Sequence, residues 1–239
     1  MGGIAENTLL LVIEGNITTG KTIFVNNLAK TLQKISNKIY IHNPNTKQKH
    51  IISDDINICD LFYLDPKRWT AEFLMNTLSS KLDFLNKHSQ EPNSILIMER
   101  SIKTESEVFI KSLYDCNMIT NVTYKICCEL VDAINGMCEL FLKSASISYI
   151  YLKTDPTDLF DALIIHNVYD SINFTLLNSI HKNYERYLNK DTDELKGDVI
   201  QLNIPFEQIF KPNAVTIKNA FKQLQHIYPI FQNIPPGSF

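Results

Sequence analysis

An octapeptide near the start of the chain has the residue types and the spacing that bind phosphate. It follows the pattern G-x-x-x-x-G-K-[ST] and consists of Gly15, Asn16, Ile17, Thr18, Thr19, Gly20, Lys21 and Thr22. In such a loop the backbone N–H groups and the start of the following helix surround phosphate oxygens. The lysine reaches the β- and γ-phosphates, and the last hydroxyl is a ligand of Mg²⁺.

The residues on either side of this pattern support its function. Residues 9–13 form a continuous apolar run, which predicts a strand that is covered on both faces. Residues 21–34 place Phe24, Leu28 and Leu32 near helical spacing. A strand before the loop and a helix after it favour a phosphate-binding loop over the alternative, a plain strand-to-helix turn. Because such loops serve kinases, GTPases and ATPases alike, the reaction depends on the rest of the chain.

Two further groups of residues have the chemistry of a binding site. Glu99 and Arg100 directly follow the apolar residues 94–98, where we predict the end of a strand. Tyr63 and Trp69 are aromatic residues on either side of a helix start. Each group also has a structural interpretation, as an ion pair and as core aromatics respectively.

The pattern of apolar runs predicts the elements that must position these residues. We expect strands at residues 9–13, 38–41, 94–98, 147–152 and 199–202, and helices at 21–34, 121–142, 174–188 and 215–227, with one more beginning at Pro156. Strands that alternate with helices imply right-handed crossovers and a parallel sheet. The polar residues 46–55 predict a loop. We expect one domain over residues 1–239, with a core of about 8–227 and a frayed tail at 228–239.

Composition excludes several classes of partner. The formal net charge is −3 and no basic stretch dominates, which argues against nucleic acid. No apolar run approaches the ~20 residues of a membrane span. The five cysteines contain no C-x-x-C pair, so we expect reduced thiols, no zinc site and a cytoplasmic protein.

Four segments, in order, resemble the deoxyribonucleoside kinases, the P-loop kinases that include thymidine, deoxycytidine and deoxyguanosine kinases. Residues 11–22 resemble the family run I/V-E-G-N-I-x-x-G-K-T, and residues 63–69 resemble Y-x-D-P-x-x-W. Residues 99–101 match E-R-S, and residues 151–156 resemble Y-L-R-x-x-P. Downstream, the spacing of the helix after the family's lid is followed by Leu177, His181, Tyr184, Glu185 and Leu188. The resemblance covers about residues 8–205.

The resemblance implies a three-layer α/β P-loop kinase fold with a five-stranded parallel sheet flanked by helices. It implies a function in nucleotide salvage, with transfer of the γ-phosphoryl of ATP to the 5′-hydroxyl of a deoxynucleoside. It also implies Mg²⁺ and a homodimer. Lys21, Glu99 and Arg100 would be catalytic, and Thr22 and Glu99 would hold the metal. The substrate would be bound by Asn43, Tyr63, Trp69, Leu74 and Arg100, with Tyr63 on the sugar 3′-hydroxyl.

The chain departs from the family on the acceptor side. Asn43 occupies the position of a glutamate that takes the proton of the 5′-hydroxyl, and an amide is no base at neutral pH. Loss of a general base lowers the rate of a reaction by a factor of about 10²–10⁴. His42 is the neighbouring titratable residue, but on an extended strand its side chain should point away from that of Asn43, so we do not expect it to replace the base. The lid, residues 158–170, contains no arginine or lysine and only His166 as a candidate cation. Leu74 replaces the glutamine that pairs with the nucleobase.

Three hypotheses follow. The first is a working Mg·ATP-dependent nucleoside kinase with altered specificity. The second is a kinase homologue that binds nucleotide, catalyses little and acts as a binding or scaffold protein, supported by Asn43, Leu74 and the arginine-free lid. The third, a nucleotide switch outside this family, has the least support because no N-K-x-D motif occurs.

Overall fold

A five-stranded sheet forms the centre of the computed structural model, which describes residues 8–34, 36–42, 51–53, 56–166, 172–189, 197–209 and 214–228. The strand order is β2-β5-β1-β6-β7 and every pairing is parallel. The strands are β1 (Leu9–Gly15), β2 (Ile39–His42), β5 (Ile95–Glu99), β6 (Ser146–Lys153) and β7 (Asp198–Asn203). The predicted parallel sheet and its five strands are confirmed.

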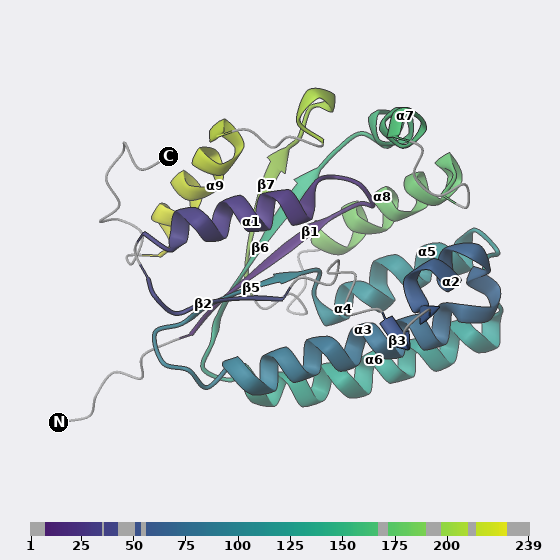
Figure 1. Ribbon diagram of the computed structural model, residues 1–239, viewed down its shortest axis with the longest axis horizontal. Coiled ribbons are helices and arrows are strands. Elements are labelled where there is room, and N and C mark those ends of the chain that lie inside the picture. The colour runs from purple at the N-terminus through teal and green to yellow at the C-terminus, as the bar shows by residue number, and fades with distance from the viewer. Residues whose placement is uncertain are drawn as a thin grey trace.

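Helices cover both faces of this sheet (Figure 1). On one side lie α1 (Lys21–Leu32) and α9 (Ala214–Ile227), and on the other lie α3 (Pro66–His88) and α6 (Asn121–Phe141). The remaining helices are α2 (Ile58–Leu64), α4 (Ile102–Thr104), the π-helix η2 (Glu105–Ile110), α5 (Lys111–Asp115), α7 (Pro156–His166), α8 (Phe174–Leu188) and the 3₁₀-helix η3 (Phe206–Gln208). The predicted three-layer α/β fold is therefore correct.

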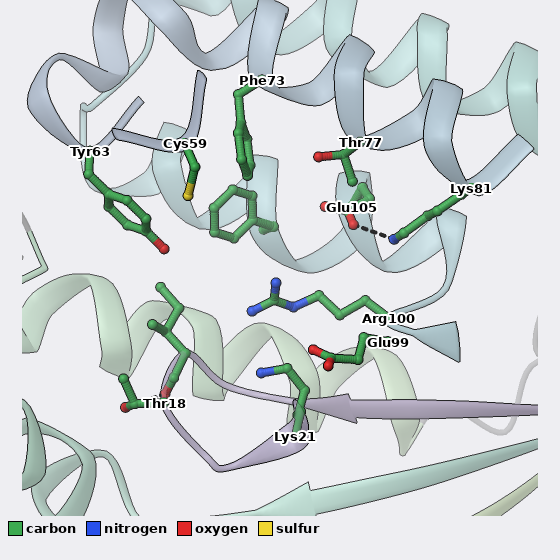
Figure 2. A pocket seen from close by; sticks show the side chains of 12 residues that line it. Thr18, Lys21, Cys59, Tyr63, Phe73, Thr77, Lys81, Glu99, Arg100 and Glu105 are labelled. Carbon is green, nitrogen blue, oxygen red and sulfur yellow. Dashed lines mark hydrogen bonds and ion pairs between the residues drawn. The ribbon is translucent and has the colours of Figure 1, made fainter. Parts of the chain in front are cut away.

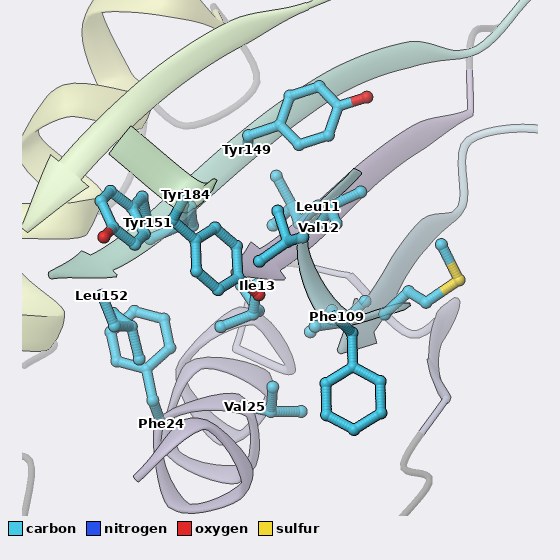
Figure 3. Close-up of a cluster of buried hydrophobic side chains, with 14 of the residues drawn as sticks. Leu11, Val12, Ile13, Phe24, Val25, Phe109, Tyr149, Tyr151, Leu152 and Tyr184 are labelled. Atoms are coloured by element: carbon cyan, nitrogen blue, oxygen red, sulfur yellow. The ribbon is translucent and has the colours of Figure 1, made fainter. Parts of the chain in front are cut away.

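The central strand β1 explains where the core lies. All seven of its residues are buried, because it pairs with β5 on one side and β6 on the other while helices cover both faces. Figure 3 shows Leu11, Val12 and Ile13 of β1 among buried side chains from the surrounding helices and strands. In a parallel sheet all carboxyl ends lie at one edge, so the ends of β1 and β5 open on the same side.

Aspartate side chains cap the N-termini of two helices near this edge of the sheet. The side chain of Asp65 accepts a hydrogen bond from the backbone N–H of Arg68 at 3.2 Å, and Pro66 follows it at the start of α3. The side chain of Asp155 likewise accepts from the backbone N–H of Thr157 at 2.8 Å, where α7 begins as predicted.

The predicted loop at residues 46–55 is partly wrong. Ile51–Ser53 forms strand β3, which pairs antiparallel with β4 (Ile56–Asn57). Consecutive β-branched isoleucines favour extended backbone, and the polar composition of the segment concealed this signal. The rest of the segment and residues 229–239 of the predicted tail lie outside the described residues. Among the helices that the structure describes, none has the length and the apolar composition required to cross a membrane.

Candidate active site

The glycine-rich loop begins where β1 ends and leads directly into α1. Gly15 has φ 152°, and a Cβ on it would lie 3.0 Å from the carbonyl oxygen of Leu152, so a larger residue does not fit. The side chain of Asn16 fixes the next turn, because its Oδ1 accepts from the N–H of Ile17 and its Nδ2 donates to the carbonyl of Leu177, both at 2.8 Å. No side chain caps the N-terminus of α1. The loop thus presents a helix start to an anionic ligand, as the sequence predicts.

Lys21 lies in this loop with only 7% of its surface exposed. Its Nζ donates to the carbonyl of Asn16 at 2.5 Å. Burial, and then the nearby charge of Arg100, lower the pKa of Lys21 to about 7, although Glu99 and other carboxylates oppose this shift. An ammonium in this environment gains from an incoming anion such as a triphosphate.

A cavity opens beside Lys21, between the loop, the end of β5, and helices α2, α3 and η2 (Figure 2). Its wall consists of Ile17, Thr18, Lys21, Cys59, Tyr63, Phe73, Thr77, Lys81, Glu99, Arg100, Glu105 and Phe109. The rings of Phe73 and Phe109 give it apolar faces, and charged side chains line the side where Arg100, Glu99 and Glu105 lie. Burial raises the pKa of the Cys59 thiol to about 11, so this side chain is a neutral part of the wall.

Glu99 and Arg100 enter the cavity at the carboxyl end of β5. Glu99 is 2% exposed, and its buried Oε1 has no hydrogen-bond partner among the described residues. Arg100 has φ 57°, in the left-handed region, and its backbone N–H donates to the carbonyl of Ile13 at 3.0 Å. Its guanidinium lies 5.6 Å from the ring centroid of Phe109. The structure therefore brings the three predicted catalytic residues, Lys21, Glu99 and Arg100, to one cavity.

The wall of the cavity also contains three polar residues that the sequence analysis missed. The Nζ of Lys81 lies 2.5 Å from Oε1 of Glu105, and also donates to the carbonyl of Ser101 at 3.2 Å. One turn earlier on α3, the buried Oγ1 of Thr77 has no hydrogen-bond partner among the described residues. A signal existed in the sequence, because Lys81 interrupts the apolar stripe formed by Leu74, Leu78 and Leu85.

The predicted substrate-binding residues are divided between the cavity and the core. Tyr63 is part of the wall. Leu74 is 1% exposed and packs in the core instead, while the preceding Phe73 lines the cavity. Trp69 is half-buried, outside the described wall, with the guanidinium of Arg68 at 4.7 Å from its ring centroid.

The other predicted positions are not among the residues that line the cavity, or they lie outside the described residues. Thr22 is half-buried at the start of α1. Asn43 lies outside the described residues, as do the side chain of His166 and the lid residues that follow it. His42 is fully buried against α3, with Nε2 at 3.0 Å from Oγ of Ser80, so its side chain is directed away from the cavity.

The oxygen atoms near the loop fit a metal ion that is bound mainly by the phosphates of a ligand. Within the described ranges, no group of three or more His, Cys, Asp or Glu side chains is arranged to bind a metal ion. Mg²⁺ commonly binds through one or two protein oxygens, substrate phosphates and water. The unpartnered Oε1 of Glu99 is an oxygen of this kind, close to the phosphate loop.

A phosphate loop between a central parallel strand and a helix, facing a cavity with acidic and basic groups, defines a P-loop nucleotide-binding α/β protein. Residues 11–224 match the sequence model of the family described as deoxynucleoside kinase. The chain belongs to the deoxynucleoside kinase family. The resemblance of the four sequence segments is thereby confirmed.

Known proteins with low sequence identity to this chain are named as deoxynucleoside kinases. The chain is 24% identical to a probable deoxycytidine kinase of Fowlpox virus over 84% of its own length and 80% of the relative's. It is 26% identical to the mitochondrial deoxyguanosine kinase of Xenopus laevis, covering 82% and 78% of the two chains. It is 26% identical to the mitochondrial thymidine kinase 2 of Homo sapiens, covering 84% and 69%. These relatives support a nucleoside kinase role.

Proposed function

We propose that this protein transfers the γ-phosphoryl group of ATP to the 5′-hydroxyl of a deoxynucleoside, and that it does so slowly. The observation that carries the proposal is the convergence of Lys21, Glu99 and Arg100 on one cavity with aromatic walls. Relatives named for deoxycytidine, deoxyguanosine and thymidine point to a nucleoside acceptor.

The residues of the cavity divide the chemistry between them. The loop and Lys21 would bind the phosphates of ATP, and Thr22 and Glu99 would hold Mg²⁺, which would neutralise charge on the phosphates. Arg100 lies between the phosphates and the acceptor. The 5′-oxygen forms the new bond to the γ-phosphorus as the bond to ADP breaks, and the hydroxyl proton leaves to solvent. Phosphoryl transfer consists mostly of positioning and charge neutralisation, so this set supports turnover without a strong base.

The nucleoside occupies the far part of the cavity. Tyr63 lies at the sugar, and the rings of Phe73 and Phe109 cover the faces of the base. The polar edge of the base meets Thr77, Lys81 and Glu105. These side chains include hydrogen-bond donors and acceptors, so they can recognise the base although position 74 has leucine in place of the family's glutamine.

Two features of the sequence make turnover slow. Asn43 provides no carboxylate for the proton of the acceptor, a loss of about 10²–10⁴ in rate. Residues 158–170 provide no arginine to stabilise the transferring phosphoryl group. We therefore expect Asn43→Glu to raise kcat by about tenfold or more.

The test is phosphoryl transfer from Mg·ATP to a panel of deoxynucleosides and nucleoside monophosphates, with an active relative measured in parallel. We expect turnover of at least one nucleoside, reduced at least about 100-fold by Lys21→Ala. Lys30→Ala is the matched control, because Lys30 is an exposed lysine on the same helix α1. Absence of turnover by the wild-type chain, while the relative is active, would support the binding or scaffold protein instead.

We also propose a cytoplasmic homodimer that associates through α6. This helix exposes four large apolar side chains, Val122, Ile126, Met137 and Leu140. The five cysteines are all free, which suits a reducing compartment. Light scattering should give about twice the 27.5 kDa of one chain, and Ile126→Glu should give the monomer. Val215→Glu alters an equally exposed residue on α9 and should leave the dimer intact; a monomeric wild-type chain contradicts the proposal.

A further inference from the structure

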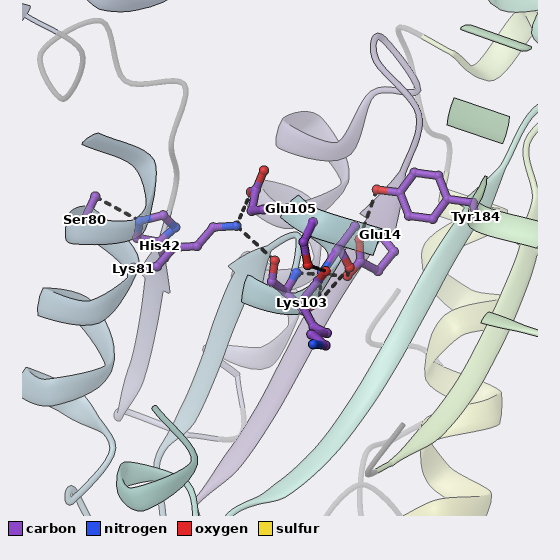
Figure 4. A network of polar contacts seen from close by, with 10 residues as sticks. Glu14, His42, Ser80, Lys81, Lys103, Glu105 and Tyr184 are labelled. Atoms are coloured by element: carbon purple, nitrogen blue, oxygen red, sulfur yellow. Dashed lines mark hydrogen bonds and ion pairs between the residues drawn. The ribbon is translucent and has the colours of Figure 1, made fainter. Parts of the chain in front are cut away.

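The side chain of Glu14 lies at the carboxyl end of β1, next to the turn that follows β5. It is fully buried, and its Oε1 accepts hydrogen bonds from the backbone N–H of Ser101 at 2.9 Å and from Oγ1 of Thr104 at 2.6 Å. Its other oxygen, Oε2, accepts from the hydroxyl of Tyr184 on α8 at 3.1 Å (Figure 4). One carboxylate thus joins three parts of the chain: the end of β1, the turn after β5 and helix α8.

The chemistry of these groups fixes the direction of each hydrogen bond around Glu14. A carboxylate only accepts, so the hydroxyl of Thr104 donates to it. The Oγ of Ser101 lies 2.6 Å from Oγ1 of Thr104, and it accepts from the backbone N–H of Thr104 at 3.0 Å. Because Thr104 has a single hydroxyl proton, Ser101 is the donor between the two hydroxyls. The turn is therefore tied to the carboxylate by one defined arrangement of donors and acceptors.

This turn contains Arg100, which has an uncommon backbone conformation. Its φ of 57° lies in the left-handed region, which a residue with a side chain keeps only where the surrounding contacts enforce it. The N–H of Arg100 donates to the carbonyl of Ile13 at 3.0 Å, and the N–H of the next residue, Ser101, donates to Glu14. Two consecutive residues of β1 thus hold two consecutive N–H groups of the turn. The side chains of Glu99 and Arg100 line the cavity there.

We infer that Glu14 is a positioning residue, whose carboxylate fixes the turn after β5 and thereby directs the side chain of Arg100 into the cavity. The inference rests on the proposed kinase function, in which Arg100 lies between the phosphates and the acceptor. Glu14 is fully buried and is not among the described residues of the cavity wall, so it acts through Arg100 and not on a ligand.

The first experiment replaces Glu14 by glutamine and by leucine. Glutamine keeps an oxygen for Ser101 and Thr104, and its amide N–H can donate to the hydroxyl of Tyr184, which turns to accept. Glu14→Gln should therefore retain at least about a third of the wild-type kcat. Leucine is apolar and leaves the buried donors of the turn unpaired, so Glu14→Leu should lower kcat about 100-fold or more. A large loss in Glu14→Gln, equal to that in Glu14→Leu, would overturn the inference.

Thr104→Val is a milder change, which decides the question if Glu14→Leu fails to fold. It removes one hydrogen bond to the carboxylate and should lower kcat about fivefold or more, with the KM for ATP within about twofold, because the phosphate loop is unchanged. Thr70→Val is the matched control, since both threonines are 0% exposed and both hydroxyls donate at 2.6 Å. It should leave kcat within about twofold. If the two threonine variants had the same kcat, the inference would fail.

A double-mutant cycle separates positioning from loss of stability. In an Arg100→Ala background, Thr104→Val should change kcat by less than about twofold, because the group that the turn positions is already absent. A general loss of stability acts in both backgrounds, so effects that multiply would count against the inference.

Crystal structures of the wild type and of Thr104→Val give a readout that does not depend on turnover. The Arg100 side chain should be ordered and directed into the cavity in the first, and displaced or disordered in the second. An unchanged Arg100 overturns the inference whether or not the protein is active. Conversely, a wild-type chain without turnover refutes the proposed function and leaves this structural comparison decisive.

Discussion

The ammonium of Lys81 and the carboxylate of Glu105 form an ion pair of 2.5 Å that is almost entirely buried, with 1% and 5% of the two side chains exposed. Lys81 comes from α3 and Glu105 from η2, so the pair joins two walls of the cavity. Figure 4 shows it between the contact of Ser80 with His42 on one side and that of Glu14 with Tyr184 on the other. The pair is thus a structural link between two walls of the cavity, and under the proposed function it is also a polar surface for the substrate.

Removal of one partner should therefore be costly. Lys81→Met leaves the Glu105 carboxylate buried and unpaired, and should lower the free energy of unfolding by about 3–5 kcal/mol. Urea denaturation measures this change. Lys103→Met is the control, because its partner Asp132 is 60% exposed and such pairs contribute about 0–1 kcal/mol. Similar losses in the two variants would show that the buried pair is not a structural link.

The second prediction concerns two glycines in different settings. A Cβ on Gly15 would lie 2.9 Å from Oγ1 of Thr19 and 3.0 Å from the carbonyl of Leu152, at φ 152°. Gly15→Ala should therefore distort the loop, lower stability and abolish detectable binding of ATP. Gly136 lies on α6, and a Cβ on it would meet no atom of another segment within 4 Å. Gly136→Ala should raise the free energy of unfolding by about 0.5–1 kcal/mol, because alanine favours helix.

Thermal unfolding and titration with ATP measure both variants. Gly136→Ala should keep the wild-type affinity for ATP. The prediction for Gly15 fails if Gly15→Ala binds ATP with unchanged affinity, since the loop would then tolerate a side chain at its first position.

The sequence predicted most of the fold and the place of the glycine-rich loop between β1 and α1. Local patterns were sufficient there, because a continuous apolar strand, a glycine-rich loop and a helix follow one another along the chain. The polar part of the cavity wall was harder to predict. Thr77, Lys81 and Glu105 meet only after α3 and η2 have packed together, and no local pattern reports such a meeting.

Leu74 shows the limit of a motif match. It occupies the family's base-reading position in the sequence, but on α3 its side chain faces the core, and Phe73 and Thr77 face the cavity. The segment from Ile51 to Ser53 shows another limit, since a strand of three residues depends on its partner β4 more than on its own composition.

The third prediction concerns the pH dependence of ATP binding. In the free protein the pKa of Lys21 is about 7, which lies below the ordinary value of 10.5. A bound triphosphate favours the charged ammonium and raises this pKa, so above about pH 7 binding must take up a proton. The affinity for ATP should fall as the pH rises from about 7, by at most tenfold per pH unit. Below about pH 7 the ammonium is already charged and this contribution disappears.

Calorimetry in two buffers with different ionisation enthalpies counts the protons. At pH 8 the wild type should take up close to one proton for each ATP bound. The Lys21→Ala variant lacks this ammonium, so it should take up no such proton. Its affinity for ATP should be weaker and should no longer fall above about pH 7. Uptake that is equal in the two proteins would assign the proton to another group.

The last prediction compares two threonines on α3 that are both buried. Oγ1 of Thr77 has no hydrogen-bond partner among the described residues and lies in the wall of the cavity. Oγ1 of Thr70 donates to the carbonyl of Pro66 at 2.6 Å, in a side chain that is 0% exposed. An unpaired buried hydroxyl is unfavourable, whereas a paired one contributes about 1 kcal/mol. Replacement by valine should therefore have opposite effects on stability at the two positions.

Thr77→Val should raise the free energy of unfolding by up to about 1 kcal/mol, and Thr70→Val should lower it by about 1 kcal/mol. If the Thr77 hydroxyl binds the nucleobase, Thr77→Val should also raise the KM for the nucleoside about fivefold or more, since the base loses a partner in a buried site. Thr70→Val should leave that KM unchanged. A stabilised Thr77→Val variant with an unchanged KM would show that the hydroxyl does not contact the substrate, and the base would then be recognised by Lys81 and Glu105 alone.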